Sequence, residues 1–276
     1  MKKAQRAFTT ALMTMLFMMC GSFLSISTTQ VSAQVSGQVP GQVPGQVTET
    51  IPLISYHSHV PFVTSTDKGL TYDLAAYLNK KATGRYLFQA RVMSRPRVNN
   101  LIESSRTYVV PWVNPSWFKD EEETKYLWTQ NVLLFGKNVV ISRQNNKVIY
   151  NGPSSLSGFK FGGLRGHHYI GIDDYILQSV NTIRIDSDRH LSNIQKLLNG
   201  LIDVTTMPSS AANYFISKLN LAQSLFIAPK PQSSYERKML INNKRQDIQA
   251  FLDRAILTMA DDPEWQAILK KYKDGE

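Results

Sequence analysis

The sequence predicts an α/β protein of two lobes, and three observations lead to this prediction. Strand-like and helix-like segments alternate over residues 51–112, the same order restarts near residue 161, and two amphipathic segments close the chain. Such alternation is typical of mostly parallel sheets with helices on both faces. The roughly 225 residues from position 51 onward suit two lobes better than one.

The first unit opens with an apolar strand at 51–56. Leu74, Ala75 and Leu78 then recur at the spacing of a helix, and Thr83-Gly84 lies just past its end. The remaining elements expected here are a strand at 86–92, a polar helix at 97–103 and a strand at 108–112.

The second unit repeats this plan after a strand-rich passage at 138–142. Its expected elements are a weak strand at 161–164, a helix at 173–178, a strand at 182–185, a helix at 191–198, a strand at 202–207 and a helix at 211–219. Asn199-Gly200 supplies the residues that commonly end a helix.

The end of the chain carries the clearest local signal. Apolar residues from Ile248 to Met259 keep helical spacing, and Asp262-Pro263-Glu264 has the cap, first-turn proline and acid of a new helix start. Trp265, Ile268, Leu269 and Tyr272 form the apolar face of that second helix. We expect both helices to be structural.

The first 33 residues are typical of a cleaved export signal. Three basic residues precede an apolar stretch from Ala11 to Ile26, and Val31-Ser32-Ala33 offers small residues to a signal peptidase. The apolar stretch is shorter than the ~20 residues that span a bilayer. We therefore expect cleavage after Ala33 and a periplasmic protein, with a retained N-terminal anchor as the alternative. Residues 34–50 repeat Gly, Gln, Val and Pro, a composition typical of a tether.

Charge and cysteine content narrow the possible partners. The chain carries a net charge of +10, and removal of residues 1–33 takes away three basic residues and no acidic one, which leaves +7. This favours anionic ligands or an anionic envelope surface, although a basic surface that only confers solubility fits equally well. The basic residues are scattered, so we expect no nucleic-acid partner. Cys20, the single cysteine, lies inside the export signal, so the mature protein has no disulfide.

Three stretches resemble the extracellular solute-binding proteins of family 3, the periplasmic receptors of polar amino-acid uptake. Residues 69–75 (GLTYDLA) resemble the family's glycine-led entry into its first helix. Residues 191–203, ending LLNGLID, resemble its helix-to-strand passage, and the tail from Phe251 to Tyr272 resembles its closing helices. The likeness is diffuse but spans nearly all of the mature chain.

The resemblance implies a periplasmic-binding-protein-like (type II) fold with two lobes joined by hinge strands and a ligand held between them. Lobe I would comprise 51–138 plus 231–276, and lobe II 139–230. The implied function is to clamp a small polar solute, possibly anionic or amino-acid-like, for an ABC-type uptake system or a sensor. We expect a monomer that works with an inner-membrane ABC permease or a sensor kinase.

The sequence departs from the family where an amino acid would be recognised. Family members grip the α-carboxylate with an arginine between the third strand and the hinge, but residues 119–124 (KDEEET) contain no arginine. The acid that holds the α-amino group is replaced by Met207-Pro208-Ser209. Both anchors of a standard α-amino acid are therefore missing.

Lobe II offers a candidate binding loop at 164–169. In the family this loop enters a helix and presents backbone N–H groups, a glycine lets the backbone approach a ligand, and an arginine can add a bidentate contact. The candidates here are Arg165, Gly166, His167 and Tyr169, and a solvated surface loop is the alternative. At 186–190, Asp188 is expected to cap the next helix while Arg189 or His190 faces the cleft.

The lobe I candidates follow the ends of expected strands, where clefts form in α/β proteins. They are Tyr56, His59, Arg95, Trp112, Asn114 and Trp117. Core packing is the alternative for Trp112, and a solvent-facing basic cap is the alternative for Arg95 and its neighbour Arg97.

We expect neither a metal nor another cofactor, because His57 and His59 alternate on one strand-like segment without a third ligand nearby. The sequence contains no Gly-x-Ser-x-Gly elbow, no phosphate-binding glycine loop and no His-Glu-x-x-His. We therefore expect a binding protein and not an enzyme. An exported enzyme on the same scaffold, dehydratase-like, and an interaction protein with a degenerate, ligand-free cleft are the alternatives.

Overall fold

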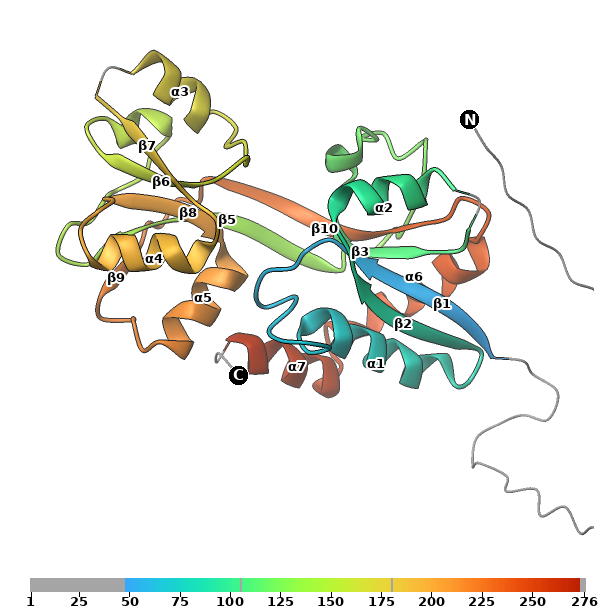
Figure 1. Cartoon of the computed structure of the whole chain (residues 1–276). Coiled ribbons are helices and arrows are strands. Elements are labelled where there is room, and N and C mark those ends of the chain that lie inside the picture. Colours follow the sequence, from blue (N-terminus) through green and yellow to red (C-terminus); the bar gives the residue numbers. More distant parts are fainter. Residues whose placement is uncertain (1–47, 105, 180, 274–276) are drawn as a thin grey trace, which may run out of the picture. The chain divides into compact units, whose positions relative to one another are not determined.

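The computed structural model of this protein describes residues 48–104, 106–179 and 181–273 (Figure 1). The expected export signal and the tether up to residue 47 lie outside the described residues. Glu49 and Thr50, which we placed in the tether, already belong to the first strand because they pair with Tyr86 and Leu87. No helix within the described residues is long and apolar enough to span a bilayer.

The strands form one continuous sheet in the order β2-β1-β3-β10-β5-β8-β6-β7. The bounds are β1 Glu49–Ser55, β2 Tyr86–Val92, β3 Val109–Val113, β5 Leu134–Arg143, β6 Lys160–Leu164, β7 Ile183–Ser187, β8 Val204–Pro208 and β10 Ser233–Ile241. Two short strands pair at the side of this path, β4 (Leu127–Trp128) with β10 and β9 (Leu225–Ile227) with β5.

Lobe I is built on the parallel strands β1, β2 and β3. One face packs against α1 (Leu70–Ala82), α6 (Gln246–Met259) and α7 (Pro263–Lys273), and the other face packs against α2 (Arg95–Ile102). Neighbouring residues of β1 divide between these faces, since Leu53 belongs to the first core and Ile54 to the second. Every residue of β3 is buried, as expected for a parallel strand covered on both sides.

Lobe II repeats this plan on the parallel strands β6, β7 and β8. Its helices are α3 (Ile172–Gln178), α4 (His190–Leu198) and α5 (Ser209–Lys218). Val140 packs into a core with Phe161 and Ile172, whereas its neighbour Ile141 packs with Ile194 on the opposite face. Each lobe therefore buries both faces of its own sheet.

Two long antiparallel strands, β5 and β10, connect the lobes (Figure 1). Residues 233–237 of β10 pair with residues 134–138 of β5, while the rest of β10 pairs with β3 and the rest of β5 pairs with β8. These are the hinge strands that the resemblance implied. Helix α5 of lobe II also lies against α7 of lobe I.

The closing helices form as predicted. The Asp262 carboxylate accepts from the backbone N–H of Glu264 at 2.9 Å and thereby caps α7. It also accepts from the Tyr77 hydroxyl at 2.8 Å, which ties the start of α7 to α1. Trp265 and Tyr272 are buried in the lobe I core.

The strands and helices expected from periodicity are all present, with shifted bounds. The short strands β4 and β9 were not predicted, and neither was β10. Residues 233–237 of β10 alternate half-buried or buried positions with exposed ones, while residues 239–241 are buried throughout. The strand therefore has the pattern of a surface strand at one end and of a core strand at the other.

Candidate functional site

The candidate site lies where loops from the two lobes meet beyond the ends of parallel strands. In lobe I, β1 ends at Ser55 and leads into the loop that carries His57 and His59. In lobe II, β7 ends at Ser187 and is followed by His190 at the start of α4. The rings of His59 and His190 contact each other with centroids 5.9 Å apart. Loops at the carboxyl ends of parallel strands form the ligand crevices of α/β proteins.

Arg237 occupies the lobe I side of this site. It projects from the hinge strand β10 and is only 3% exposed. Its Nη1 donates to the carbonyl of Trp112 at 2.5 Å and lies 3.3 Å from Nε2 of His57, and its Nη2 donates to the Tyr235 hydroxyl at 3.2 Å. All three partners are neutral groups, and no carboxylate within the described residues forms an ion pair with Arg237.

Aromatic rings surround the Arg237 guanidinium. Its central carbon lies 5.0 Å from the ring centre of Phe62, 5.2 Å from that of Trp117 and 4.9 Å from that of Tyr235. Cation–π contacts of this kind offset part of the cost of desolvation. Burial lowers the pKa of Arg237, but an arginine stays protonated in proteins. The site therefore contains a permanent, buried positive charge.

Trp112, whose carbonyl accepts from Arg237, has an uncommon backbone conformation. Trp112 has a φ of 69°, in the left-handed region that bulky residues rarely adopt. Its indole Nε1 donates to Thr71 Oγ1 at 3.1 Å, which fixes the buried ring. Its carbonyl lies within hydrogen-bond distance of both Arg237 Nη1 and His57 Nε2. Strained residues of this kind cluster at functional sites.

His57 is buried under the same aromatic rings. Its ring lies 4.3 Å from the ring of Tyr56 and 5.1 Å from that of Phe62, measured between centroids. Burial, and after it the charge of Arg237, holds the pKa of His57 well below its ordinary value. His57 is therefore neutral at physiological pH and helps to orient Arg237 and the Trp112 carbonyl.

His59 and His190 each have a buried nitrogen without a hydrogen-bond partner. These atoms are His59 Nε2 in lobe I and His190 Nδ1 in lobe II. Burial lowers the pKa of His59 to about 3, with further contributions from His190, Arg237 and His167. Burial and then His167 lower the pKa of His190 to about 4. The surroundings of each histidine therefore disfavour its protonated, positively charged form.

Four of the residues predicted for lobe I meet around Arg237. Trp112 and Trp117 contact it directly, while Tyr56 and His59 reach it through the ring of His57. The fifth, Asn114, has a local role because its Oδ1 caps the short helix η1 (Pro115–Phe118) through the N–H of Ser116. Its Nδ2 donates to the backbone carbonyl of Glu236.

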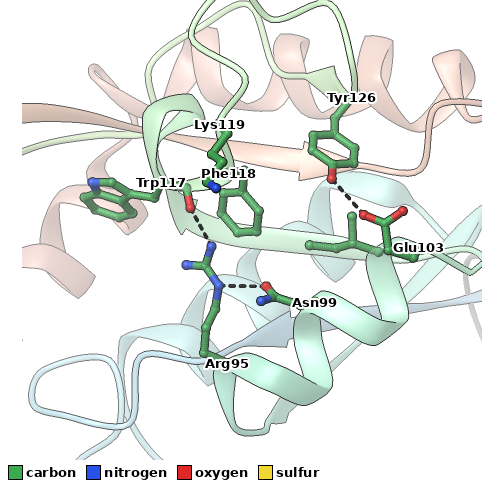
Figure 2. Close-up of a pocket in the computed structure, with 8 residues that line it drawn as sticks. Arg95, Asn99, Glu103, Trp117, Phe118, Lys119 and Tyr126 are labelled. Carbon is green, nitrogen blue, oxygen red and sulfur yellow. Dashed lines mark hydrogen bonds between the residues drawn. The ribbon is translucent and has the colours of Figure 1, made fainter. Parts of the chain in front are cut away.

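Arg95 has its own set of partners on the α2 side of lobe I. Its Nε donates to Asn99 Oδ1 at 2.8 Å and its Nη2 donates to the Trp117 carbonyl at 2.6 Å (Figure 2). The guanidinium also stacks over the rings of Phe118 at 4.0 Å and Tyr56 at 4.5 Å. The Arg95 guanidinium thus contacts two rings, and two of its nitrogens are used locally.

A cavity of about 210 Å³ lies beside Arg95, between α2 and the η1 segment (Figure 2). Polar groups along its wall pair with one another, as Tyr126 does when its hydroxyl donates to Glu103 at 3.1 Å. None of the buried polar atoms without a partner belongs to a residue that lines it. The buried polar atoms of this cavity are therefore already paired, whereas the loops near Arg237 carry buried nitrogens without a partner.

The predicted lobe II residues are engaged mainly within their own loop. The side chain of Arg165 is 73% exposed and pairs with Asp188 at 3.0 Å. Gly166 has a φ of 71° and is exposed. The buried Tyr169 hydroxyl accepts from the N–H of Leu164 at 2.9 Å and belongs to the lobe II core.

Three expectations for residues 167–190 can be compared with the geometry. The ring of His167 packs edge-on against Tyr169 at 4.4 Å, and its pKa is lowered, first by burial and then by Arg184. Asp188 does not cap α4, because its carboxylate pairs with Arg165 and no side chain caps that helix. His190 does face lobe I, as its contact with His59 shows.

The passage at 119–124, where the family has its anchor arginine, is organised by Asp120. This buried carboxylate accepts from the backbone N–H groups of residues 124, 125 and 126 and from the indole of Trp128 at 2.7 Å. Burial alone would raise the pKa of Asp120, but these hydrogen bonds outweigh it and lower the pKa. The passage is therefore a folded loop, and both oxygens of the Asp120 carboxylate accept hydrogen bonds from within the protein.

Sequence reasoning missed three residues of the site: Phe62, Tyr235 and Arg237. The signal for Arg237 lies in its spacing, because Arg237, Met239 and Ile241 alternate along the buried face of one strand. A charged residue in register with core positions indicates a functional or paired charge. Within the described residues, no group of three or more His, Cys, Asp or Glu side chains is placed to hold a metal ion.

No family model and no curated protein matches this chain. Solved structures do match. An ancestral arginine-binding protein bound to arginine aligns with a TM-score of 0.61 at 15% identity, over 82% of this chain and 99% of its own. AbpA from Streptococcus pneumoniae, an amino acid ABC transporter substrate-binding protein bound to L-arginine, aligns with a TM-score of 0.58 at 15% identity, over 82% of this chain and 95% of its own.

The periplasmic VFT2 domain of Bordetella pertussis BvgS aligns with a TM-score of 0.52 at 16% identity, over 81% of this chain and 93% of its own. These likenesses show the fold. The protein has the two-lobe, periplasmic-binding-protein-like α/β fold, as the sequence predicted.

Proposed function

We propose that this protein is a solute-binding protein that closes its two lobes over one small polar solute. The observation that carries the proposal is the pair of partnerless buried atoms, His59 Nε2 in lobe I and His190 Nδ1 in lobe II. A buried polar atom without a partner costs about 1–3 kcal/mol. A solute that bonds to both atoms would stabilise the closed arrangement over the open one.

The proposed role is binding without turnover. The groups around the site are a guanidinium, imidazoles and aromatic rings. A dehydratase-like reaction needs a general base and a general acid of matched pKa. Asp188 pairs with Arg165 and Asp120 is held by its own loop, while Glu236, the neighbour of Arg237 on β10, is exposed. We therefore propose that the solute is released unchanged.

The cellular context of the proposal follows from the sequence. We propose a periplasmic protein that acts as a monomer, and the export signal predicted in residues 1–33 supports this location. Two of the structural neighbours illustrate the partners we propose, since AbpA is described as an ABC transporter substrate-binding protein and VFT2 as a periplasmic domain of BvgS. We propose an inner-membrane ABC permease or a sensor kinase as the partner.

The test is a screen of the purified full chain against amino acids, small carboxylates, short peptides and polyamines by differential scanning fluorimetry. A solute at a hundred times its Kd adds about 2.7 kcal/mol, which is several degrees of Tm for a chain of this size. Small-angle X-ray scattering should show a smaller radius of gyration with the same solute, and NMR should recover that solute unchanged. If no member of the panel stabilised the protein, the ligand-free interaction protein would replace this proposal.

A further inference from the structure

The charge of Arg237 lacks compensation from the protein itself. The guanidinium has five N–H donors. It donates to one carbonyl and one hydroxyl oxygen, those of Trp112 and Tyr235, and its Nη1 lies 3.3 Å from His57 Nε2, which accepts only in the tautomer that carries the ring proton on Nδ1. A buried charge is normally paired with an opposite charge, and an unpaired one is costly. A structural role alone would be served at less cost by an apolar residue at this position.

The groups that approach Arg237 from the two lobes are themselves basic or neutral. The pKa of His59 is lowered first by burial and then by three neighbours, His190, Arg237 and His167. No acidic side chain of the described chain contributes to the pKa shifts of His59 or His190. A cationic ligand would therefore meet only like charge here, while an anion would meet an arginine and two titratable imidazoles.

Resting on the function proposed above, we propose that Arg237 anchors a small organic carboxylate in the cleft, with His59 and His190 closing over the anion. The planar guanidinium matches a carboxylate better than any other side chain does. The rings of Trp117 and Tyr235, which already flank the guanidinium, would pack against the carbon skeleton of the ligand. This anchor stands on a hinge strand, so the ligand would touch the element that joins the lobes.

The other arginines considered for this role have partners of their own. Arg95 is held by Asn99, the Trp117 carbonyl and two aromatic rings. Arg165 is largely exposed and pairs with Asp188. Arg237 differs from both in combining near-complete burial with wholly neutral partners.

The experiment is isothermal titration calorimetry of the full chain at pH 7.5 with matched probes. The pairs are L-lactate with L-lactamide and propionate with propionamide, and agmatine, a cation without a carboxylate, and sodium sulfate complete the set. We expect at least one carboxylate to bind at least 10-fold more tightly than its amide, because hydrogen bonds to a charged group contribute more than those to a neutral group. Agmatine should bind more weakly than L-lactate.

Variants identify the anchor. Arg237→Gln should weaken carboxylate binding at least 10-fold, and Arg237→Lys should restore part of it because the charge returns without the fork of donors. The matched control is Arg254→Gln, since Arg254 is an exposed arginine on α6 and away from the site. A merely structural Arg237 would lower Tm in the variant but leave the ratio between carboxylate and amide affinities unchanged.

A second measurement applies if Arg237→Gln does not fold. An anion between His59 and His190 favours their protonated forms, so the affinity of the wild-type protein for L-lactate should rise at least 3-fold from pH 7.5 to pH 6.0. His190→Gln should flatten this dependence.

Three outcomes would overturn the anchor. They are binding of sulfate with no carboxylate, tighter binding of agmatine than of L-lactate, and a carboxylate affinity that does not change with pH or with Arg237. If a neutral or cationic solute still closed the lobes, the protein would be a solute-binding protein, but Arg237 would not be its carboxylate anchor.

Discussion

Arg237 and Arg95 both contact Trp117, yet their surroundings give them different properties. Arg95 donates to an amide and a carbonyl and lies over two rings at the surface of lobe I. Arg237 is nearly fully buried. One of its acceptors, the Trp112 carbonyl, also lies 3.1 Å from His57 Nε2. The position of an arginine in the sequence does not separate these cases, because burial and partners are set by distant strands.

The two partnerless histidines should make the unliganded protein sensitive to acid. The pKa values of His59 and His190 are lowered to about 3 and about 4, whereas an unfolded histidine titrates near 6.5. The unfolded chain therefore binds more protons between these values, and stability must fall as pH decreases below about 6.5. The groups around them are His57, His167 and Arg237, all of which oppose protonation or add positive charge.

The measurement is urea unfolding of the wild type and of His190→Gln at pH 7 and pH 5 without ligand. The wild type should lose about 1 kcal/mol more of its free energy of unfolding across this interval than the variant does, after allowance for solvent screening. Carboxylates that titrate in the same range are common to both proteins and cancel in the difference. Equal losses in the two proteins would mean that His190 stays solvated and protonates freely.

At the scale of elements, periodicity was sufficient for segments that bury one face in a single environment along their whole length. The helix at 246–259 and the strand at 86–92 could be predicted because each buries one face against its own lobe. Strand β10 could not, because its residues pair with β3 and β4 at one end and with β5 at the other. Its burial pattern changes along the strand, because one end lies in the lobe I sheet and the other end pairs with β5 in the hinge.

The same reasoning explains which site residues were found. Tyr56, His59, Trp112 and Trp117 follow predicted strands, so their place near a cleft was expected. Arg237 was missed because it lies on β10, a strand that was not predicted, and its burial could not be inferred without that strand.

Gly136 on β5 is a further consequence of the hinge pairing. It lies opposite Tyr235 in the β5–β10 ladder, and a Cβ at this position would come within 2.2 Å of the Tyr235 ring. Gly136→Ala should therefore displace a ring whose hydroxyl accepts from Arg237. We expect a loss of about 1–3 kcal/mol in stability, typical of overpacking, together with weaker binding of the carboxylate.

Thermal unfolding and calorimetry with L-lactate or propionate measure both effects for Gly136→Ala. The matched control is Gly84→Ala, since a Cβ there meets no atom within 4 Å and Gly84 lies at the far end of α1. Gly84 has a φ of 86°, so its variant should lose some stability from backbone strain but keep its affinity. A normal affinity in Gly136→Ala would show that the Tyr235 ring has room to move without disturbing Arg237.

At the scale of the whole molecule, each lobe has cores of its own. The two lobe II cores draw only on residues between 139 and 228, whereas the lobe I cores combine residues 51–134 with residues 239–272. Lobe II is thus an insertion into lobe I. The chain leaves and returns at adjacent points, because the N–H of Gln232 donates to the carbonyl of Asn138 at 2.8 Å.

This arrangement predicts that residues 139–230 fold as an independent unit, with the boundaries proposed from the sequence. A segment of this size that contains both of its apolar cores and has neighbouring ends meets the requirements of a domain. The isolated segment should show an α/β circular dichroism spectrum, dispersed amide NMR signals and a cooperative thermal transition. It should be less stable than the intact protein, because α5 loses its contact with α7.

Residues 51–138 are the matched control for this experiment. They carry β1, β2 and β3 but lack β10 and the helices that contribute Ile256, Trp265 and Tyr272 to the same core. This segment should remain unfolded alone and should fold only when 231–276 is joined to it. A cooperative transition in 51–138, or none in 139–230, would place the boundary elsewhere. Because each lobe has its own cores, the lobes can move about β5 and β10 without disrupting a shared core. The proposed closure of the lobes over a solute requires this freedom.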